Sequence, residues 1–515
     1  MAYRAQQINP WVGVGAAALV AALILGTLGV VAWRAPDAGQ LEPSDWAAIR
    51  FTVSQALLSA LISVALAIPV ARGLSRRQFF GRSVLITLLG APFLLPVIVA
   101  VMGLLAVFGR SGWMSQALGL VGLPPIPIYG FHGVVIAHVF FNLPLATRII
   151  LQGWAGIPAE RFRLAAQLGF RGADIARHLE WPMLKRAAPG AFAIIFAICL
   201  SSFAVALTLG GGPRATTVEL AIYQAFRFDF DLGKAALLAS IQLVLAGSAA
   251  MLALWASKGQ SGFGSGLDRL AVRWDGATTS ARITDFAVIA LAGLFLLVPL
   301  LAVGMRGAAA LPELPASVWY SAWLSIKVAT LSASLACLIS LSIALAAVRF
   351  AWIEGVGLLA IAASPLVIGT GLFIVIFPVA SPQDWAMVVT ACVNAVMAMP
   401  FALRVLIPAV QDVSDSYGRL SIGLGLSRWS MLRLVILPRI RAPLGFAIGL
   451  AAALSMGDLG VVALFAGTDE ATLPLQIYRL MGAYKMDPAA GAALLLALLS
   501  FGVFWMCDTW GRRYA

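Results

Sequence analysis

Two ionisable residues of this sequence, Lys327 and Asp458, lie well inside long apolar stretches. A charge at the centre of a bilayer costs about 2.5 to 3.5 kcal/mol on insertion scales, so such residues mark ligand pathways or bind one another. Asp458 could stabilise a cationic ligand in transit, or it could form a structural ion pair with Lys327. We favour the ion pair, because a tight charged site in a pathway would slow release of the ligand.

Other residue types that carry chemistry show no site-like spacing. The three histidines are scattered, and the four cysteines lie in apolar stretches without a CxxC pair, so neither a metal site nor a disulfide is expected. A membrane-embedded enzyme would need converging catalytic groups, such as paired carboxylates. Charged residues are nearly absent from the apolar stretches, and we therefore expect no enzymatic activity in this chain.

Two segments share a spacing that suits a mechanical role. Each has Gly, nine residues, an aliphatic residue, any residue, a bulky apolar residue and Pro. The residues are Gly169, Leu179, Trp181 and Pro182 in the first segment and Gly425, Val435, Leu437 and Pro438 in the second. The Gly permits a backbone turn, the next residues can form about two helical turns along the membrane surface, and the Pro can start the following helix.

The elements that position these segments must be membrane-spanning helices. Apolar residues make up 61% of the 515 positions and charged residues 11%, against roughly 25% charged residues in a soluble domain. A helical span needs about 20 apolar residues. Twelve such stretches are predicted, at 11–33, 51–71, 84–108, 133–154, 190–210, 235–257, 284–305, 321–348, 355–378, 386–409, 444–465 and 489–508.

The net charge of +13 is distributed as in a membrane protein. With the N-terminus inside, the inner loops and the span ends beside them hold 25 of the 35 Lys and Arg residues, and the outer loops hold 9. This positive-inside asymmetry predicts that both termini are cytoplasmic. It also explains the basic composition without nucleic-acid binding, which we exclude.

The sequence divides into two similar halves. We predict a first half at 1–258, a cytoplasmic linker at 259–283 that begins with the Gly/Ser-rich stretch KGQSGFGSG, and a second half at 284–515. At an offset of 256 residues, nine of the 39 positions from Pro144 to Pro182 are identical to those from Pro400 to Pro438. The Gly segments fall in equivalent loops, at about 155–189 and 411–443. Such duplication is common in transporters, whose pathway runs between the repeats.

The loop pattern resembles the signature EAA-x3-G-x9-I-x-LP of binding-protein-dependent ABC importer permeases. The resemblance implies an all-α polytopic membrane protein, with twelve transmembrane helices as two homologous six-helix halves in the type I permease fold. It also implies that both loops dock into an ATPase subunit. The residues that match the loop positions are Arg163, Leu164, Ala165, Gly169, Leu179 and Pro182, and Arg419, Leu420, Ser421, Gly425, Val435 and Pro438.

One departure concerns the acidic position of the signature. Six residues before the Gly, where the family usually has Glu, this sequence has Arg163 and Arg419. The contact that the family's Glu makes therefore cannot be carried over to these positions.

Longer stretches resemble one subfamily, the fused permeases for thiamine and thiamine pyrophosphate of Gram-negative bacteria. They are AHVFFNLPLATRIILQ (137–152), AAQLGFRGADIARHLEWP (165–182), GGGPRATTVELAIYQAF (210–226) and SMGDLGVVALF (455–465). That subfamily shares the Arg-Leu before the loop. The resemblance implies a multi-pass protein of the bacterial inner membrane that carries thiamine or its phosphate esters by alternating access. The permanent charge of a thiazolium would give Asp458 a cationic ligand.

The resemblance also implies partners. The sequence has no G-x-x-x-x-G-K-[ST] phosphate loop, so we expect ATP and Mg²⁺ to bind a separate ABC ATPase, in two copies, and expect no cofactor in this chain. The outer loops are short, so a periplasmic substrate-binding protein is expected as well. Two alternatives remain open. One is a fused ABC permease for another substrate such as ferric iron, and the other is a twelve-span secondary transporter of the major-facilitator type.

Overall fold

The computed structural model describes residues 10–90, 94–210, 212, 215–256, 273–467 and 470–513. Every regular element in these ranges is helical, which confirms the predicted all-α polytopic fold. Eleven helices are long and apolar enough to cross a membrane, and a pair bent by 87° would make a twelfth span. The Gly/Ser-rich stretch 258–266 lies outside the described residues.

The first half supplies six spans, of which four are single unbroken helices and two are broken. They are α1 (Pro10–Arg34), α2 (Pro43–Arg76), α3 (Arg82–Leu88) with α4 (Val97–Phe108), α6 (Phe131–Ala155), α9 (Trp181–Leu200) with α10 (Phe203–Leu209), and α12 (Leu232–Ala256). Shorter helices connect them. These are α5 (Trp113–Leu120), α7 (Ala159–Gln167), α8 (Gly172–Ile175) and α11 (Val218–Gln224).

The second half repeats this plan. Its spans are α13 (Thr279–Ala310), α14 (Ala316–Ala347), α15 (Gly355–Ala362) with α16 (Pro365–Ile376), α17 (Ala386–Gly423), α20 (Arg441–Met456) with α21 (Gly460–Phe465), and α23 (Met486–Arg513). The connecting helices are α18 (Arg428–Met431), α19 (Leu437–Arg439) and α22 (Leu473–Gly482). Helix α17 continues to Gly423, so the first part of the predicted second loop, from about 411, is helical.

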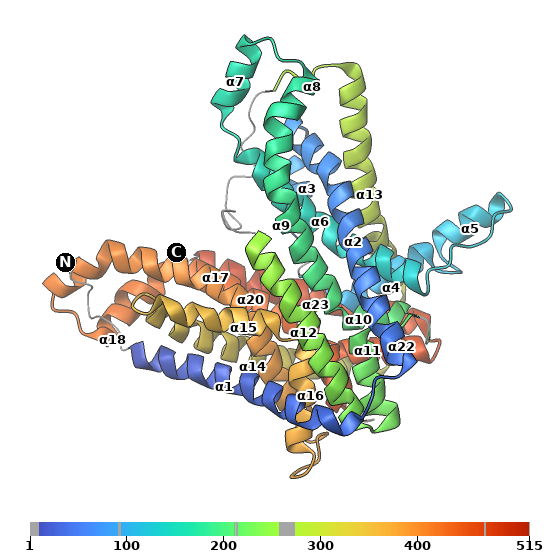
Figure 1. Ribbon diagram of the computed structural model, residues 1–515, viewed down its shortest axis with the longest axis vertical. Coiled ribbons are helices and arrows are strands. Elements are labelled where there is room, and N and C mark those ends of the chain that lie inside the picture. The colour runs from blue at the N-terminus through green and yellow to red at the C-terminus, as the bar shows by residue number, and fades with distance from the viewer. Residues whose placement is uncertain are drawn as a thin grey trace.

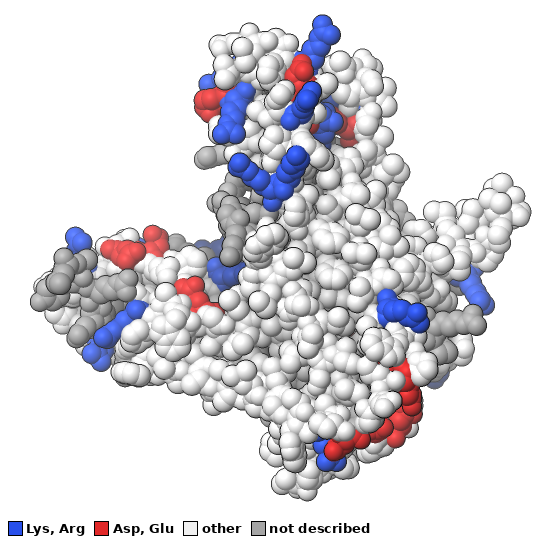
Figure 2. Space-filling view, viewed as in Figure 1, with Lys and Arg blue, Asp and Glu red and all other residues white. Residues whose placement is uncertain are grey.

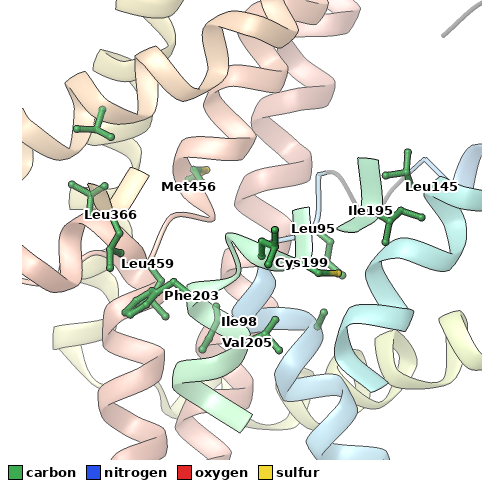
Figure 3. Packing of buried hydrophobic residues seen from close by; sticks show 14 of the residues in the cluster. Leu95, Ile98, Leu145, Ile195, Cys199, Phe203, Val205, Leu366, Met456 and Leu459 are labelled. Atoms are coloured by element: carbon green, nitrogen blue, oxygen red, sulfur yellow. The ribbon is translucent and has the colours of Figure 1, made fainter. Parts of the chain in front are cut away.

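The third and fifth spans of each half are broken, which the predicted continuous stretches did not anticipate. Pro96 and Pro365 begin the outer helices of the two third spans, since Pro lacks an N–H and disfavours a helical residue before it. The fifth spans break at Ser201–Ser202 and at 457–459. The breaks lie together in the core, where Figure 3 shows Leu95, Phe203, Leu366, Met456 and Leu459, all of them buried.

The first span of each half packs against the other half. Helix α1 lies along α14 and α16, whereas α13 lies along α2 and α4. Both crossings need a glycine, because a Cβ atom on Gly371 would lie 2.6 Å from the Thr27 carbonyl oxygen and one on Gly103 would lie 2.6 Å from that of Pro299. The halves predicted from sequence are therefore interlocked in space.

Figure 1 shows that the helices form two arms that meet at one end and diverge at the other. One arm contains α2, α6, α9 and α13 and carries α7 and α8 at its tip, while the other contains α14, α17 and α20 and carries α18. Lys and Arg residues gather at both tips (Figure 2). The arms thus present the two Gly loops on separate, basic ends of the molecule.

Candidate functional site: two matched loops

The first Gly loop is a turn between two surface helices. Helix α7 ends at Gln167, and the chain reverses at Gly169, whose φ is +68°. The N–H of Phe170 donates to the carbonyl of Ala165, and that of Gly169 donates to the carbonyl of Ala166, both at 3.0 Å. This pairing closes the C-terminus of the helix with a left-handed residue, a position that favours glycine.

The second loop repeats this turn with the same bonds. Gly425 has a φ of +63°. The N–H of Leu426 donates to the carbonyl of Ser421, and that of Gly425 donates to the carbonyl of Ile422, both at 3.0 Å. Each of these residues lies 256 positions after its counterpart in the first loop. The offset predicted from sequence therefore describes the backbone of both loops.

After each turn the chain forms the same short surface helix. Helix α8 continues through one π-helical turn, Ala176–Glu180, into the fifth span α9, and α18 continues through another, Leu432–Ile436, into α19, which precedes the fifth span α20. Ile175 and Met431, at matching positions, are fully buried and anchor these helices. A helix anchored by packing at its end moves with the span that it joins, so each loop is fixed to its arm.

The predicted loop residues divide into an exposed set and an anchoring set. Arg163, Leu164, Arg419, Leu420 and Pro182 are exposed; Ala165 and Ser421 are buried; Leu179, Val435 and Pro438 are half-buried. The structure brings each group of six together within its own loop, but the two loops lie on different arms (Figure 1).

Exposed leucines give each loop an apolar tip. Leu164 on α7, Leu168 directly after it, and their counterparts Leu420 and Leu424 have 56% to 66% of their surface exposed. Apolar side chains that cluster on an otherwise polar end suit a protein partner rather than water. Because both loops carry exposed leucines at equivalent positions, the two loop tips suit two copies of the same partner.

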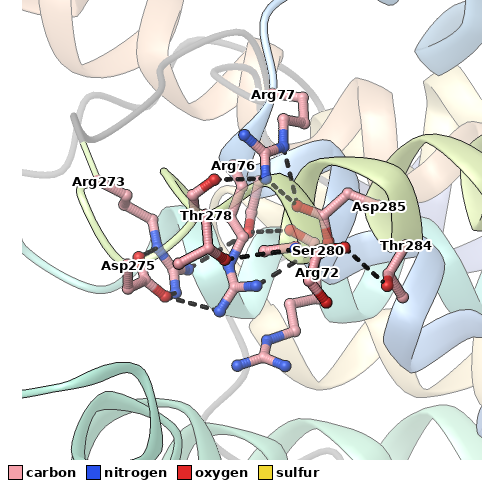
Figure 4. A network of polar contacts seen from close by, with 12 residues as sticks. Arg72, Arg76, Arg77, Arg273, Asp275, Thr278, Ser280, Thr284 and Asp285 are labelled. Carbon is pink, nitrogen blue, oxygen red and sulfur yellow. Dashed lines mark hydrogen bonds and ion pairs between the residues drawn. The ribbon is translucent and has the colours of Figure 1, made fainter.

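A buried ionic cluster, which the sequence did not predict, supports the first loop. Glu180 accepts from Arg273 at 2.6 Å and from Arg72 at 2.8 Å, and the indole Nε1 of Trp154 donates to it at 3.3 Å. Asp275 pairs with Arg76 at 2.6 Å and with Arg273 at 2.7 Å. Figure 4 shows how these side chains from α2 and the segment before α13 converge.

The cluster ties the second half to the first. Asp285 on α13 pairs with Arg77 at 2.7 Å, and the Arg273 guanidinium lies 4.8 Å from the ring centroid of Phe162 on α7. Burial alone would raise the pKa of Asp275, but hydrogen bonds and charge from Arg273 and Arg76 hold that pKa below its usual value. Asp275 is therefore ionised at neutral pH, and the segment before α13 belongs structurally to the first loop.

The ion pair expected between Lys327 and Asp458 does not form. Lys327 is exposed on α14, with its ammonium 5.2 Å from the ring centroid of Trp323. Asp458 lies in the break between α20 and α21, where its Oδ1 accepts from the N–H of Gly460 at 3.3 Å. Across the described residues no ion pair within 4.0 Å joins the two side chains, because they lie on separate elements and the acid points to a helix start.

This geometry makes a prediction for the variants Asp458→Asn, Lys327→Met and the double. Lys327→Met should leave the thermal stability of the purified protein unchanged, and the double variant should match Asp458→Asn, since unlinked substitutions add within about 0.5 kcal/mol. Thermal unfolding monitored by tryptophan fluorescence measures all three. A double variant clearly more stable than Asp458→Asn would mean that the two charges do interact.

The geometry places another buried acid, Glu219, between the halves. It lies between the predicted stretches 190–210 and 235–257 and is not among the predicted site residues. Its side chain is 2% exposed and accepts hydrogen bonds from Ser364 and Gln242. Its burial depends on the packing of α11 against α12, which no local pattern indicates.

Two interlocked six-span halves that carry matched Gly loops define a polytopic permease of the ABC importer type. The chain belongs to the family of thiamine transport system permease proteins. It is 40% identical to the thiamine transport system permease protein ThiP of Escherichia coli over 98% of this chain and 97% of that protein. The protein of the same name from Salmonella typhimurium is 38% identical over 100% and 99% of the two chains. That from Haemophilus influenzae is 34% identical over 88% and 86%.

No family model matches the chain. The relatives favour neither the permease for ferric iron nor the secondary transporter of the major-facilitator type. With eleven to twelve apolar helices, they identify a multi-pass inner-membrane protein.

Proposed function

We propose that this chain is the membrane permease of an ATP-driven importer for thiamine and its phosphate esters, with a translocation pathway between its two arms. The matched Gly loops support this most directly. They present two identical backbone turns with apolar tips, 256 residues apart, on separate arms. Two copies of an ABC ATPase would bind them, hydrolyse ATP with Mg²⁺, and bring the tips together. A periplasmic binding protein would deliver the substrate to the opposite side.

Reconstitution tests this proposal. The chain is co-purified with its ATPase, placed in liposomes with the binding protein, and assayed for ATP hydrolysis and uptake. Thiamine, thiamine pyrophosphate and a ferric chelate are compared at equal concentrations. We expect stimulation and uptake with the thiamine compounds only. Stimulation by the ferric chelate alone, or uptake without ATP, would overturn the proposal.

The proposed orientation has both termini in the cytoplasm. It rests on the distribution of Lys and Arg and on the basic arm tips (Figure 2). Periplasmic-reporter fusions at Gly212 after α10 and at Gly467 after α21 should both be active, because equivalent points in two six-span repeats face the same side. Fusions at Gly169 and Gly425 serve as controls that should be inactive. An inactive reporter at Gly212 or Gly467 would refute this topology.

A further inference from the structure

The segment from α11 to Phe230 belongs to the first half, and the segment from Ser364 through α16 to Phe377 belongs to the second half. They touch at three levels. Glu219 contacts Ser364, Phe226 packs on Phe373 with ring centroids 5.0 Å apart, and Phe230 packs on Phe377 at 6.2 Å. The partners in these three contacts are separated by 145, 147 and 147 residues. We call this row of contacts the seam.

The seam is buried at its inner end and exposed at its outer end. Phe226 and Phe373 are buried, whereas Phe230 and Phe377 are 64% and 44% exposed. Eleven residues of mostly helical chain separate Glu219 from Phe230, a rise of about 16 Å. Glu219 therefore lies about 16 Å from Phe230 along the chain, which is about half of the roughly 30 Å thickness of a bilayer's hydrocarbon core.

Two neutral groups hydrogen-bond to the carboxyl group of Glu219. Its Oε1 accepts from the Ser364 hydroxyl at 2.5 Å and from the Gln242 amide at 3.3 Å. Gln242 also donates to the carbonyl of Leu200, where α9 ends. Among the described residues, Glu219 forms no ion pair with Lys, Arg or His. A buried acid in a membrane without a cationic partner is costly to keep, which marks it as functional.

The position of Ser364 makes this hydrogen bond sensitive to movement of the halves. Ser364 precedes Pro365 at the bend of 87° between α15 and α16, and its hydroxyl caps α16 by accepting from the N–H of Leu366 at 3.2 Å. Any separation of α11 from α16 removes the Ser364 donor from Glu219. Binding sites in transporters commonly form at such broken spans between repeats.

Aromatic residues share the helix face of Glu219. Tyr223 lies one helical turn after Glu219 on α11 and packs on Phe203 with ring centroids 5.4 Å apart, and Phe226 follows two turns after Glu219 on the same face. A carboxylate beside aromatic faces suits a flat organic cation, which gains charge pairing and cation–π attraction together. A metal ion would instead require several oxygen ligands.

We propose that Glu219 is the intramembrane binding site for the organic cation that this permease carries, and that its hydrogen bond to Ser364 closes the site while the seam is shut. The identity of the cation as a thiazolium rests on the proposed function. When the seam opens, Ser364 withdraws, and the cation replaces it at the carboxylate. When the seam closes, Ser364 returns and favours release toward the diverging arms.

Variants of Glu219 separate charge from shape. In the reconstituted complex with its ATPase and binding protein, Glu219→Gln should lower kcat/KM for thiamine uptake at least tenfold at equal assembly, because Gln keeps the size and hydrogen bonds but not the charge. Glu219→Asp keeps the charge and should recover at least a third of wild-type uptake. Equal losses in both variants, or wild-type uptake by Glu219→Gln, would refute the site.

Variants of Ser364 test the closing bond. Ser364→Ala should slow thiamine uptake, because release is less favoured, and should raise ATP hydrolysis without substrate at least twofold, since the seam opens more readily. Ser500→Ala is the matched control, because Ser500 is fully buried and donates across the halves to the carbonyl of Leu94 with no carboxylate involved. A change in Ser500→Ala as large as in Ser364→Ala would show a general packing effect and refute the closing role.

One comparison separates this inference from the proposed function. If the wild-type complex neither hydrolyses ATP faster with thiamine nor takes it up, the proposed function fails. If the wild-type complex does both and Glu219→Gln does the same, only the binding site fails.

Discussion

Replacing Gly425 with Val should abolish substrate-stimulated ATP hydrolysis and reduce uptake at least tenfold, while the spans remain inserted. A Cβ at Gly425 would meet no atom within 4 Å, so the effect is purely conformational. The residue has a φ of +63°, where a side chain costs about 1 to 2 kcal/mol and a β-branched one is a clear outlier. The turn would relax and displace Leu420 and Leu424 from their docking positions. Reconstituted ATPase and uptake assays measure the loss, and Gly169→Val should behave in the same way.

Two controls isolate the backbone requirement. Gly423→Val introduces the same side chain two residues earlier, in the last turn of α17, where the backbone is helical and no atom lies within 4 Å. It should retain activity. Gly425→Asn should retain more activity than Gly425→Val, because Asn tolerates the left-handed region. Full activity of both Val variants at Gly169 and Gly425 would count against docking through these loops.

Removing Glu180 should destabilise the protein by about 3 to 5 kcal/mol, the effect of breaking a buried ion pair and leaving its partner charged. Glu180 is 3% exposed and lies within 4.0 Å of three guanidinium groups, those of Arg72, Arg76 and Arg273. Glu180→Ala would remove the carboxylate that pairs with Arg72, and Arg76 and Arg273 would share Asp275 alone at this point of the cluster. The thermal unfolding temperature of the purified protein, and its assembly with the ATPase, measure the loss.

Matched variants test whether burial causes this effect. Asp508→Ala removes a carboxylate from the pair with Arg512, whose side chain is 70% exposed, and should cost at most about 1 kcal/mol. Glu180→Ile introduces the residue found 256 positions later, Ile436. It should be as unstable as Glu180→Ala, because the arginines persist. Equal stability of Glu180→Ala and Asp508→Ala would show that the cluster contributes little.

The features that the sequence predicted well depend on local chemistry. Apolar stretches set the number of spans, because the bilayer fixes the length of a helix that crosses it. The turns at Gly169 and Gly425 followed from spacing alone, because a left-handed turn and a helix start each need a particular residue within a few positions.

Features that depend on distant contacts were missed. Proline illustrates the limit: Pro144, Pro299 and Pro400 lie inside continuous helices, whereas Pro96 and Pro365 begin new ones. Local sequence does not distinguish the two cases, because neighbouring helices decide whether a bend is tolerated. Likewise, Arg76 and Asp275 pair across 199 residues. In the sequence alone, the arginines beside the second span are explained by the positive-inside bias, and nothing local indicates their distant carboxylate partners.

The interlocking of the first spans constrains how this protein is made. About 280 residues separate the end of α1 at Arg34 from the start of α14 at Ala316, its main neighbour. At 5 to 20 residues per second, synthesis leaves α1 without that neighbour for roughly 15 to 55 s. During this interval the surface of α1 that will pack against α14 is not covered by that helix. The surface of α2 and α4 that α13 will cover is also without its neighbour. Neither half can therefore complete its packing before the second half has entered the membrane.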